Sequence, residues 1–165
     1  MGGRRKIKAA GLKIAIIASS FNEFITKRLH AAAREALLEQ GADERDISTF
    51  WVPGAYEIPS ALAAVADTGE YDAAVCLGTV IKGETPHFDH VAREAASGIA
   101  RVSVDNRLPV GFGVITAATT DQALERAGGK RGNKGREAAL AAIDMVHVVA
   151  AIKGKKKVRL RQSES

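Results

Sequence analysis

Short apolar runs alternate with longer segments of helical periodicity along most of the chain. Four runs have the length and composition of buried strands, at residues 12–19, 46–52, 72–81 and 110–116. Apolar residues recur at helical spacing over residues 23–40, 58–67, 86–106, 120–126 and 134–152. Because strands that alternate with helices pair in parallel, the pattern predicts an α/β fold. We expect a three-layer α/β/α sandwich with a four-stranded parallel sheet, of the flavodoxin-like type.

The length of 165 residues suits a single folded domain. We expect a flexible N-terminal arm at 1–11, the domain at 12–152 and a basic C-terminal tail at 153–165. The last predicted helix is apolar around most of its circumference, more than one covered face requires. This surplus predicts burial against another subunit. The apolar residues are Leu140, Ile143, Met145, Val146, Val148, Val149 and Ile152.

The formal net charge of +5 is concentrated at the two ends of the chain. Residues 1–10 hold four cations and no acid, and residues 153–165 hold six cations against one acid, Glu164. The ends together carry +9, which leaves −4 on residues 11–152. A negative body argues against a nucleic-acid-binding fold, so we expect no nucleic-acid partner. Binding of nucleic acid through the tails alone stays open.

The number of cysteines and the lengths of the apolar segments indicate the cellular compartment in which the protein is found. The chain has one cysteine, Cys76, in the apolar run 73–77, so no disulfide forms within it. We expect a packed core thiol and a reducing compartment. The N-terminal apolar run, 14–18, is shorter than the core of a signal peptide, and no run reaches transmembrane length. These observations predict a cytoplasmic protein without a membrane partner.

Parallel sheets bind ligands in the loops beyond the carboxyl ends of their strands, so we looked there for chemistry. In the loop 82–87, Thr85 can cap the following helix, and Pro86 suits its first position. Gly83 lets a ligand approach the backbone closely. Free N–H groups at such a helix start can hold a phosphate. The alternative is an ordinary capped helix start without a ligand.

His87 falls in the first turn of that helix. The positive end of the helix dipole disfavours the imidazolium, so we expect a neutral, proton-accepting side chain. A proton-transfer role is favoured over simple packing. His90 lies three residues further along, but a third ligand at suitable spacing is missing. The sequence therefore predicts no metal.

A nine-residue segment that is rich in glycine holds four cations, Arg126, Lys130, Arg131 and Lys134. The stretch is not a P-loop, because Asn133 stands at the glycine position and no Ser or Thr follows Lys134. An anionic ligand would suit the cations. The alternative is a flexible connection with Asn133 as the cap of the last helix.

Two further side chains belong to strand-end loops. Glu57 is flanked by apolar residues and can accept hydrogen bonds from ligand hydroxyls, or it can simply favour a helix N-terminus. Phe21 is either a core residue or a stacking platform for a flat ring. These loops gather at one edge of the predicted sheet, which makes that edge the candidate site.

Four separated segments, 21–26, 51–59, 78–89 and 125–135, resemble the lumazine synthase (6,7-dimethyl-8-ribityllumazine synthase) family. The resemblance covers about residues 12–152 in the same order. It implies a transferase of riboflavin biosynthesis, at the penultimate step. The reaction condenses 5-amino-6-(D-ribitylamino)uracil with 3,4-dihydroxy-2-butanone 4-phosphate and releases phosphate and water. A non-catalytic flavin- or lumazine-binding protein of the same fold is the alternative.

The resemblance also implies roles for individual residues. Phe21 would stack on the pyrimidine ring, and His87 would shuttle protons. Other residues would line the ring pocket and hold the ribityl chain, with Glu57 on the hydroxyls: Ala55, Tyr56, Glu57, Val80 and Ile81. A further group would bind phosphate: Gly83, Glu84, Thr85 and Arg126. In this family, some residues reach the site from the neighbouring subunit: Phe112, Arg126 and Lys134.

The resemblance implies no cofactor and a homopentamer, in some members part of a sixty-subunit shell. Two positions depart from the family pattern. Glu84 stands where many members have a small residue, which places an acid beside the phosphate loop. Gly129 stands where members often carry threonine, which we interpret as a minor change. The role of the tail from Lys153 is not implied.

Overall fold

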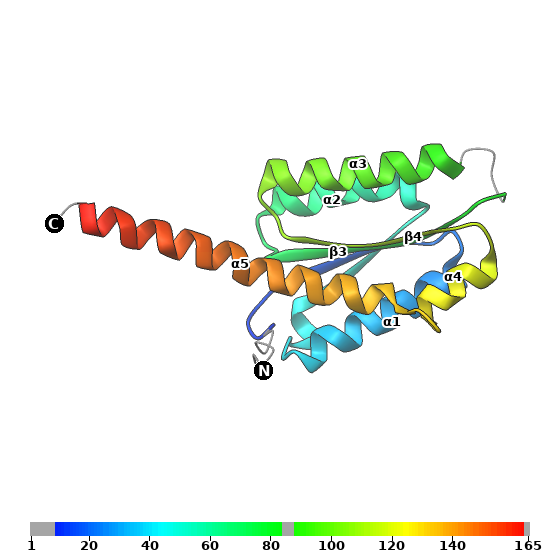
Figure 1. The fold of residues 1–165 in the computed structure, drawn as a ribbon, viewed down its shortest axis with the longest axis horizontal. Helices are drawn as coiled ribbons and strands as arrows, with labels where there is room; N and C mark the ends of the chain where they lie inside the picture. Colours follow the sequence, from blue (N-terminus) through cyan, green and yellow to red (C-terminus); the bar gives the residue numbers. More distant parts are fainter. Residues whose placement is uncertain (1–8, 84–87, 164–165) are drawn as a thin grey trace.

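The computed structural model describes residues 9–83 and 88–163, with side chains as far as residue 154. Its central sheet has four parallel strands in the order β2-β1-β3-β4 (Figure 1). The strands are β1 (Ile14–Ser19), β2 (Ile47–Val52), β3 (Ala73–Ile81) and β4 (Val110–Ala117). The predicted four-stranded parallel sheet is confirmed, because all four apolar runs form strands within two residues of their expected bounds.

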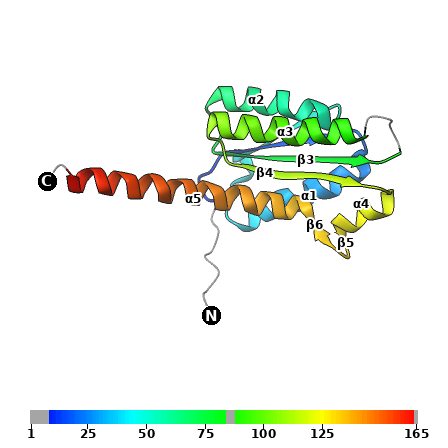
Figure 2. The same cartoon turned by 45° about the horizontal axis from the view of Figure 1, so that its top comes forward.

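Helices cover both faces of this sheet (Figures 1 and 2). One face carries α1 (Glu23–Glu39), α4 (Thr120–Arg126) and α5 (Lys134–Ser163). The other face carries α2 (Ile58–Thr68) and α3 (Phe88–Asn106). The three-layer α/β/α sandwich is therefore also confirmed.

The core follows from the period of two along the central strands. On β1, Ile14 and Ile16 pack under α1 and α5, while Ala15 and Ile17 pack under α2 and α3. Every residue of β1 and β3 is buried, because both strands are central and both faces are covered. All four strands run the same way, so their carboxyl ends meet at one edge.

The glycine-rich stretch before α5 is a small hairpin and not the flexible connection considered from the sequence. Strands β5 (Ala127–Gly129) and β6 (Gly132–Asn133) pair antiparallel. The Asn133 side chain accepts hydrogen bonds from the backbone N–H groups of Gly135 and Arg136, at 2.8 and 3.1 Å. The prediction that Asn133 caps the last helix is confirmed. Its amide also donates to the Arg28 carbonyl at 3.3 Å, which attaches the hairpin to α1.

Defined structure is also found on both sides of residues 12–152. Ala9 is fully buried and donates its N–H to the Gln40 carbonyl at 2.8 Å, so the part of the predicted arm from residue 9 belongs to the body. Residues 1–8 lie outside the described part of the chain. Helix α5 does not end at Ile152, as expected, but continues to Ser163 and projects from the body (Figures 1 and 2).

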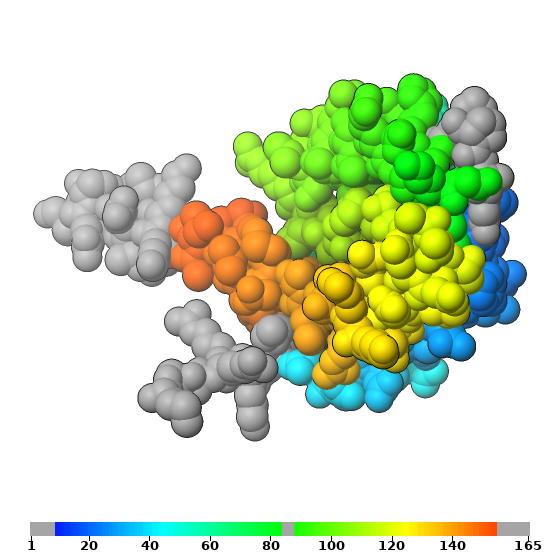
Figure 3. Space-filling model, turned by 45° about the vertical axis from the view of Figure 1, so that its right-hand side comes forward, coloured from blue at the N-terminus to red at the C-terminus, as the bar shows by residue number. Residues whose placement is uncertain are grey.

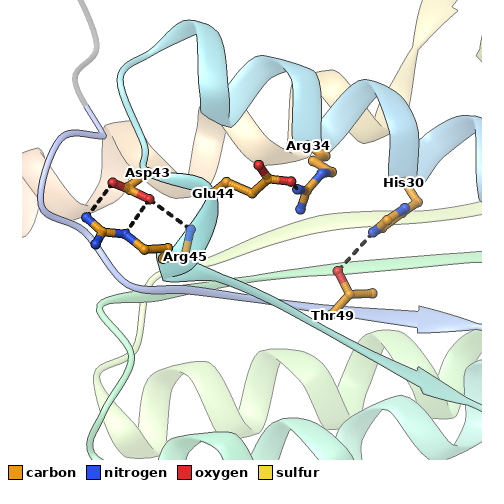
Figure 4. A network of polar contacts seen from close by, with 6 residues as sticks. All are labelled: His30, Arg34, Asp43, Glu44, Arg45 and Thr49. Atoms are coloured by element: carbon orange, nitrogen blue, oxygen red, sulfur yellow. Dashed lines mark hydrogen bonds and ion pairs between the residues drawn. The ribbon is translucent and has the colours of Figure 1, made fainter.

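Polar contacts join α1 to the turn that leads into β2 (Figure 4). His30 on α1 bonds Thr49 on β2, with 2.9 Å between Nε2 and Oγ1. Arg34 pairs with Glu44 in the short 3-10 helix η1 (Glu44–Asp46). Burial and the nearby Arg34 charge lower the pKa of His30 below its ordinary value. The His30 ring also lies 5.4 Å from that of Trp51. This half-buried imidazole is therefore harder to protonate than a free one.

Candidate active site

Backbone and side-chain hydrogen bonds hold three strand-end loops together at the carboxyl edge. The N–H of Phe21, just after β1, donates to the Pro53 carbonyl, just after β2, at 3.0 Å. The side-chain amide of Asn22 donates to the carbonyl of Thr79 near the end of β3, also at 3.0 Å. The loops after β1, β2 and β3 thus form one connected surface.

Six of the predicted site residues lie on these loops and strand ends. Phe21 and Tyr56 are 50% and 59% exposed, so neither ring is a core residue. Tyr56 belongs to a second 3-10 helix, η2 (Ala55–Glu57), which packs against β1 and β3. Ala55 and Val80 are buried in the same cluster, and Ile81 ends β3. Glu57 is exposed, and its carboxylate lies beside Gly54, where a Cβ would approach Oε2 to 3.3 Å. The structure therefore offers two aromatic faces and a carboxylate at one edge.

The predicted phosphate loop is described only in part. Gly83 follows β3 with a φ of 90°, a conformation that glycine adopts without strain. Glu84, Thr85 and His87 lie outside the described residues. The described chain resumes at Phe88, the first residue of α3. Their predicted roles thus stay predictions.

The remaining predicted residues line a separate hollow along the edge strand β4. Phe112, Arg126 and Lys134 contribute to this cavity of about 410 Å³, together with residues 113–116. Phe112 is 49% exposed. Lys134 pairs with Glu137 at 3.0 Å, whereas Arg126 has no ion pair within the described chain. None of the lining residues belongs to the group around Phe21. Thr116 of this hollow pairs with Val80 on β3, so the two groups of predicted residues lie on neighbouring strands of the described chain.

The side of the molecule that bears α4 and α5 is seen in Figure 3, with α4 in yellow and α5 in orange beside the green α3. The hairpin that follows α4 packs tightly on it, since a Cβ at Gly129 would lie 2.7 Å from the Glu125 Cα. Glycine at this position is therefore more than the minor change expected from the sequence. It lets the hairpin approach the helix that carries Arg126.

Three further observations concern the thiol, possible metal ligands and possible membrane-spanning helices. Burial raises the pKa of the Cys76 thiol to about 12, in agreement with the predicted packed core thiol. Within residues 9–83 and 88–163, no three His, Cys, Asp or Glu side chains cluster as metal ligands would. The helices of the described chain include none long and apolar enough to cross a membrane.

Asn22 is a site residue to which the sequence reasoning gave no role. It has a φ of 60° and a ψ of 39°, the left-handed conformation, which asparagine tolerates better than most residues. This conformation turns the chain from β1 into α1 and lets the side chain reach Thr79. The signal available in the sequence was an asparagine directly between a strand and a helix.

These features define an α/β sandwich protein with a candidate ligand site at the carboxyl edge of its parallel sheet. The family model of 6,7-dimethyl-8-ribityllumazine synthase matches residues 11–150, and the chain belongs to that family. It is accordingly a transferase of riboflavin biosynthesis that acts on small-molecule substrates, and members of the family oligomerise. The reaction is the condensation of 5-amino-6-(D-ribitylamino)uracil with 3,4-dihydroxy-2-butanone 4-phosphate.

Proposed function

We propose that the active site of this enzyme forms between two copies of the chain. One copy supplies the surface around Phe21 and Tyr56, and its neighbour supplies the hollow with Phe112 and Arg126. The observation that carries this proposal is that Arg126 and Lys134 line a hollow to which Phe21 does not contribute, while each group has an aromatic ring about half exposed. Exposed aromatic surface of this kind is stabilised when a partner or a ligand covers it.

The ring-bearing substrate is assigned to the first half-site. Phe21 stacks on the pyrimidinedione, and Val80 and Ile81 at the end of β3 line the ring pocket. Ala55 and Tyr56 hold the ring and the start of the ribityl chain, while the exposed Glu57 carboxylate accepts hydrogen bonds from the ribityl hydroxyls. Support comes from the gathering of these residues at one sheet edge.

The phosphate-bearing substrate is assigned to the loop after β3 and to the neighbouring copy. Gly83 and Thr85 supply backbone and hydroxyl donors, and Arg126 of the second copy neutralises the charge. Lys134 adds a second cation beside Arg126. The Glu84 carboxylate must turn outwards, because an acid facing the anion would weaken binding. The lack of an ion pair at Arg126 in the described chain supports this assignment.

The reaction then requires the protein side chains to do no more than bind the two substrates and transfer protons. The 5-amino group attacks the ketone and loses water to give an imine, and phosphate leaves by elimination to give an enol that becomes a carbonyl. The ribitylamino nitrogen then attacks this carbonyl, and the ring closes with loss of a second water. No step is a redox step, so the proposal includes no cofactor and no metal. His87 moves the protons, an effect typically worth about 10²–10⁴-fold in rate. Orientation of two bound substrates supplies much of the remainder.

We further propose that the chain forms a homopentamer, either alone or as the unit of a larger shell. We also propose that the protein is located in the cytoplasm. A ring of subunits lets every chain use both of its half-sites. The exposed apolar residues Met145, Val148 and Ile152 on α5 supply surface that an interface would cover. Sedimentation distinguishes monomer, pentamer and shell. The cytoplasmic location is supported by the single buried cysteine, and fractionation of cells tests it.

The decisive experiment mixes the protein with both substrates and follows the absorbance and fluorescence of the lumazine product. Arg126→Ala should weaken binding of the phosphate substrate and leave binding of the ring substrate intact. Lys130→Ala, a cation of the same stretch outside the hollow, is the matched control. Unchanged phosphate-substrate affinity in Arg126→Ala would refute the phosphate assignment. Binding of lumazine without turnover would favour a non-catalytic binding protein.

A further inference from the structure

Ser19, the last residue of β1, has a buried hydroxyl without a hydrogen-bond partner in the described chain. The two other buried hydroxyl side chains there, Thr26 and Thr79, bond each other at 3.0 Å. A hydroxyl that loses its contacts with water and gains no partner destabilises a fold. An alanine at this position would avoid that penalty. The presence of a serine therefore calls for a physical reason.

The hydroxyl lies at the junction of two strands and a helix. A Cβ at Gly78 on β3 would lie 2.8 Å from Ser19 Oγ and 3.4 Å from Ile58 Cδ1. The absence of a side chain at Gly78 thus leaves the space that the hydroxyl occupies. Ile58 begins α2 and directly follows η2, which carries the proposed ring-binding residues.

The surroundings of Ser19 coincide with the proposed ring pocket. Side chains alternate between the faces of a strand, so Gly78 and Val80 belong to the same face of β3. Val80, Ala55 and Ile58 are buried together on that face. Phe21 follows Ser19 by two residues, at the start of the loop. The unpartnered hydroxyl therefore lies on the face of the sheet that carries the residues assigned to the ring.

We propose that Ser19 is a positioning residue whose hydroxyl hydrogen-bonds the polar edge of the pyrimidinedione ring. The inference rests on the proposed placement of the ring between Phe21 and Val80. Stacking on Phe21 fixes the plane of the ring but leaves rotation within that plane free. The ring edge presents C=O and N–H groups, and a hydroxyl can pair with either. Ser19 is fully buried, so the proposal requires the Ile58 side chain, which borders the same space beside Gly78, to move when the ring binds.

The test compares ligand affinity with stability in Ser19→Ala. Calorimetric titration should show the dissociation constant of 5-amino-6-(D-ribitylamino)uracil raised about two- to tenfold, the range of one net hydrogen bond. The affinity for 3,4-dihydroxy-2-butanone 4-phosphate should not change. The melting temperature of the free protein should stay the same or rise, because the unpartnered hydroxyl is gone. Ser19→Cys, which has a weaker donor of similar size, should show the same loss of affinity.

Thr26→Val is the matched control, since it removes a buried hydroxyl that has a partner and leaves Thr79 without one. It should lower the melting temperature and keep the affinity for the ring substrate. Unchanged ring-substrate affinity in both Ser19 variants would overturn the proposal, whatever their stability. A fall in the melting temperature of Ser19→Ala with unchanged affinity would identify a structural hydroxyl. The phosphate assignment is judged separately by Arg126→Ala, so either idea can fail alone.

Discussion

The side-chain amide of Asn22 donates a hydrogen bond to the main-chain carbonyl of Thr79, 3.0 Å away across the carboxyl edge of the sheet. This contact joins the loop after β1 to the end of β3, one residue before Val80. Phe21, the proposed stacking residue, directly precedes Asn22. This hydrogen bond thus helps to fix the position of Phe21 relative to Val80 in the proposed pocket.

We therefore expect Asn22→Ala to lower both stability and ring-substrate affinity. Alanine loses the hydrogen bond and is strained in the left-handed conformation, so the free energy of unfolding should fall by about 1–3 kcal/mol. Urea denaturation measures the change. Asn22→Gly separates the two causes, because glycine accepts this conformation but makes no bond. If both variants matched the original protein, the contact would not hold the edge together.

A second prediction concerns two glycines on α5 in opposite surroundings. A Cβ at Gly135 would lie 2.1 Å from the Leu29 carbonyl oxygen, whereas one at Gly154 would meet nothing within 4 Å. Gly135→Ala should force α5 from α1 and destabilise the fold by about 2–3 kcal/mol. Gly154→Ala should be neutral or stabilising by up to about 1 kcal/mol, because alanine favours a helix. Thermal unfolding of the pair checks this, and equal effects would contradict it.

The third prediction is an acid sensitivity that depends on His30. Burial and Arg34 lower the pKa of this imidazole in the folded chain, so the unfolded chain takes up its proton first. Stability contributed by neutral His30 is therefore complete above about pH 6.5 and decreases as the pH falls below it. The slope of stability against pH just below 6.5 should be shallower in His30→Gln.

His90→Gln is a suitable control for that experiment, because His90 is exposed on α3. It should leave the slope unchanged. Denaturation by urea between pH 7.5 and about 5, above the range in which carboxylates ordinarily titrate, keeps the acids out of the comparison. A His30 variant with the slope of the original protein would show that the imidazole titrates alike in both states.

The fold could be predicted from the sequence because its signals are local. Runs such as 73–77 and the helical spacing of Ile25, Leu29 and Ala33 arise from the same periods that build the sheet and α1. The hairpin at 127–133 was missed because two very short strands of mainly small residues have no period to detect. The end of α5 was placed too early, although lysine, arginine and leucine after Ile152 are good helix formers.

The candidate site could be predicted only as far as strand order dictates. Parallel pairing alone brings Phe21, Glu57 and Val80 to one edge. The left-handed turn at Asn22 and the unpartnered hydroxyl of Ser19 depend on contacts between residues almost sixty positions apart. Such contacts leave no periodic trace in the sequence. The separation of Phe112 and Arg126 from the first group likewise needed the three-dimensional arrangement.

The last prediction concerns His87, whose proposed role rests on the family resemblance and on its place after β3 in the sequence. His87→Ala should slow turnover by up to about 10²–10⁴-fold, since one positioned acid–base group is worth that much. Activity should persist above the uncatalysed rate, because both substrates still bind in the right orientation. Single-turnover rates with saturating substrates measure the chemical step directly.

His90→Ala, three residues further along, controls for general effects on α3. The original enzyme should lose rate at acidic pH, where the imidazole takes up a proton, and the variant should lack this limb. A variant that keeps the same acidic limb would assign the proton transfer to another group.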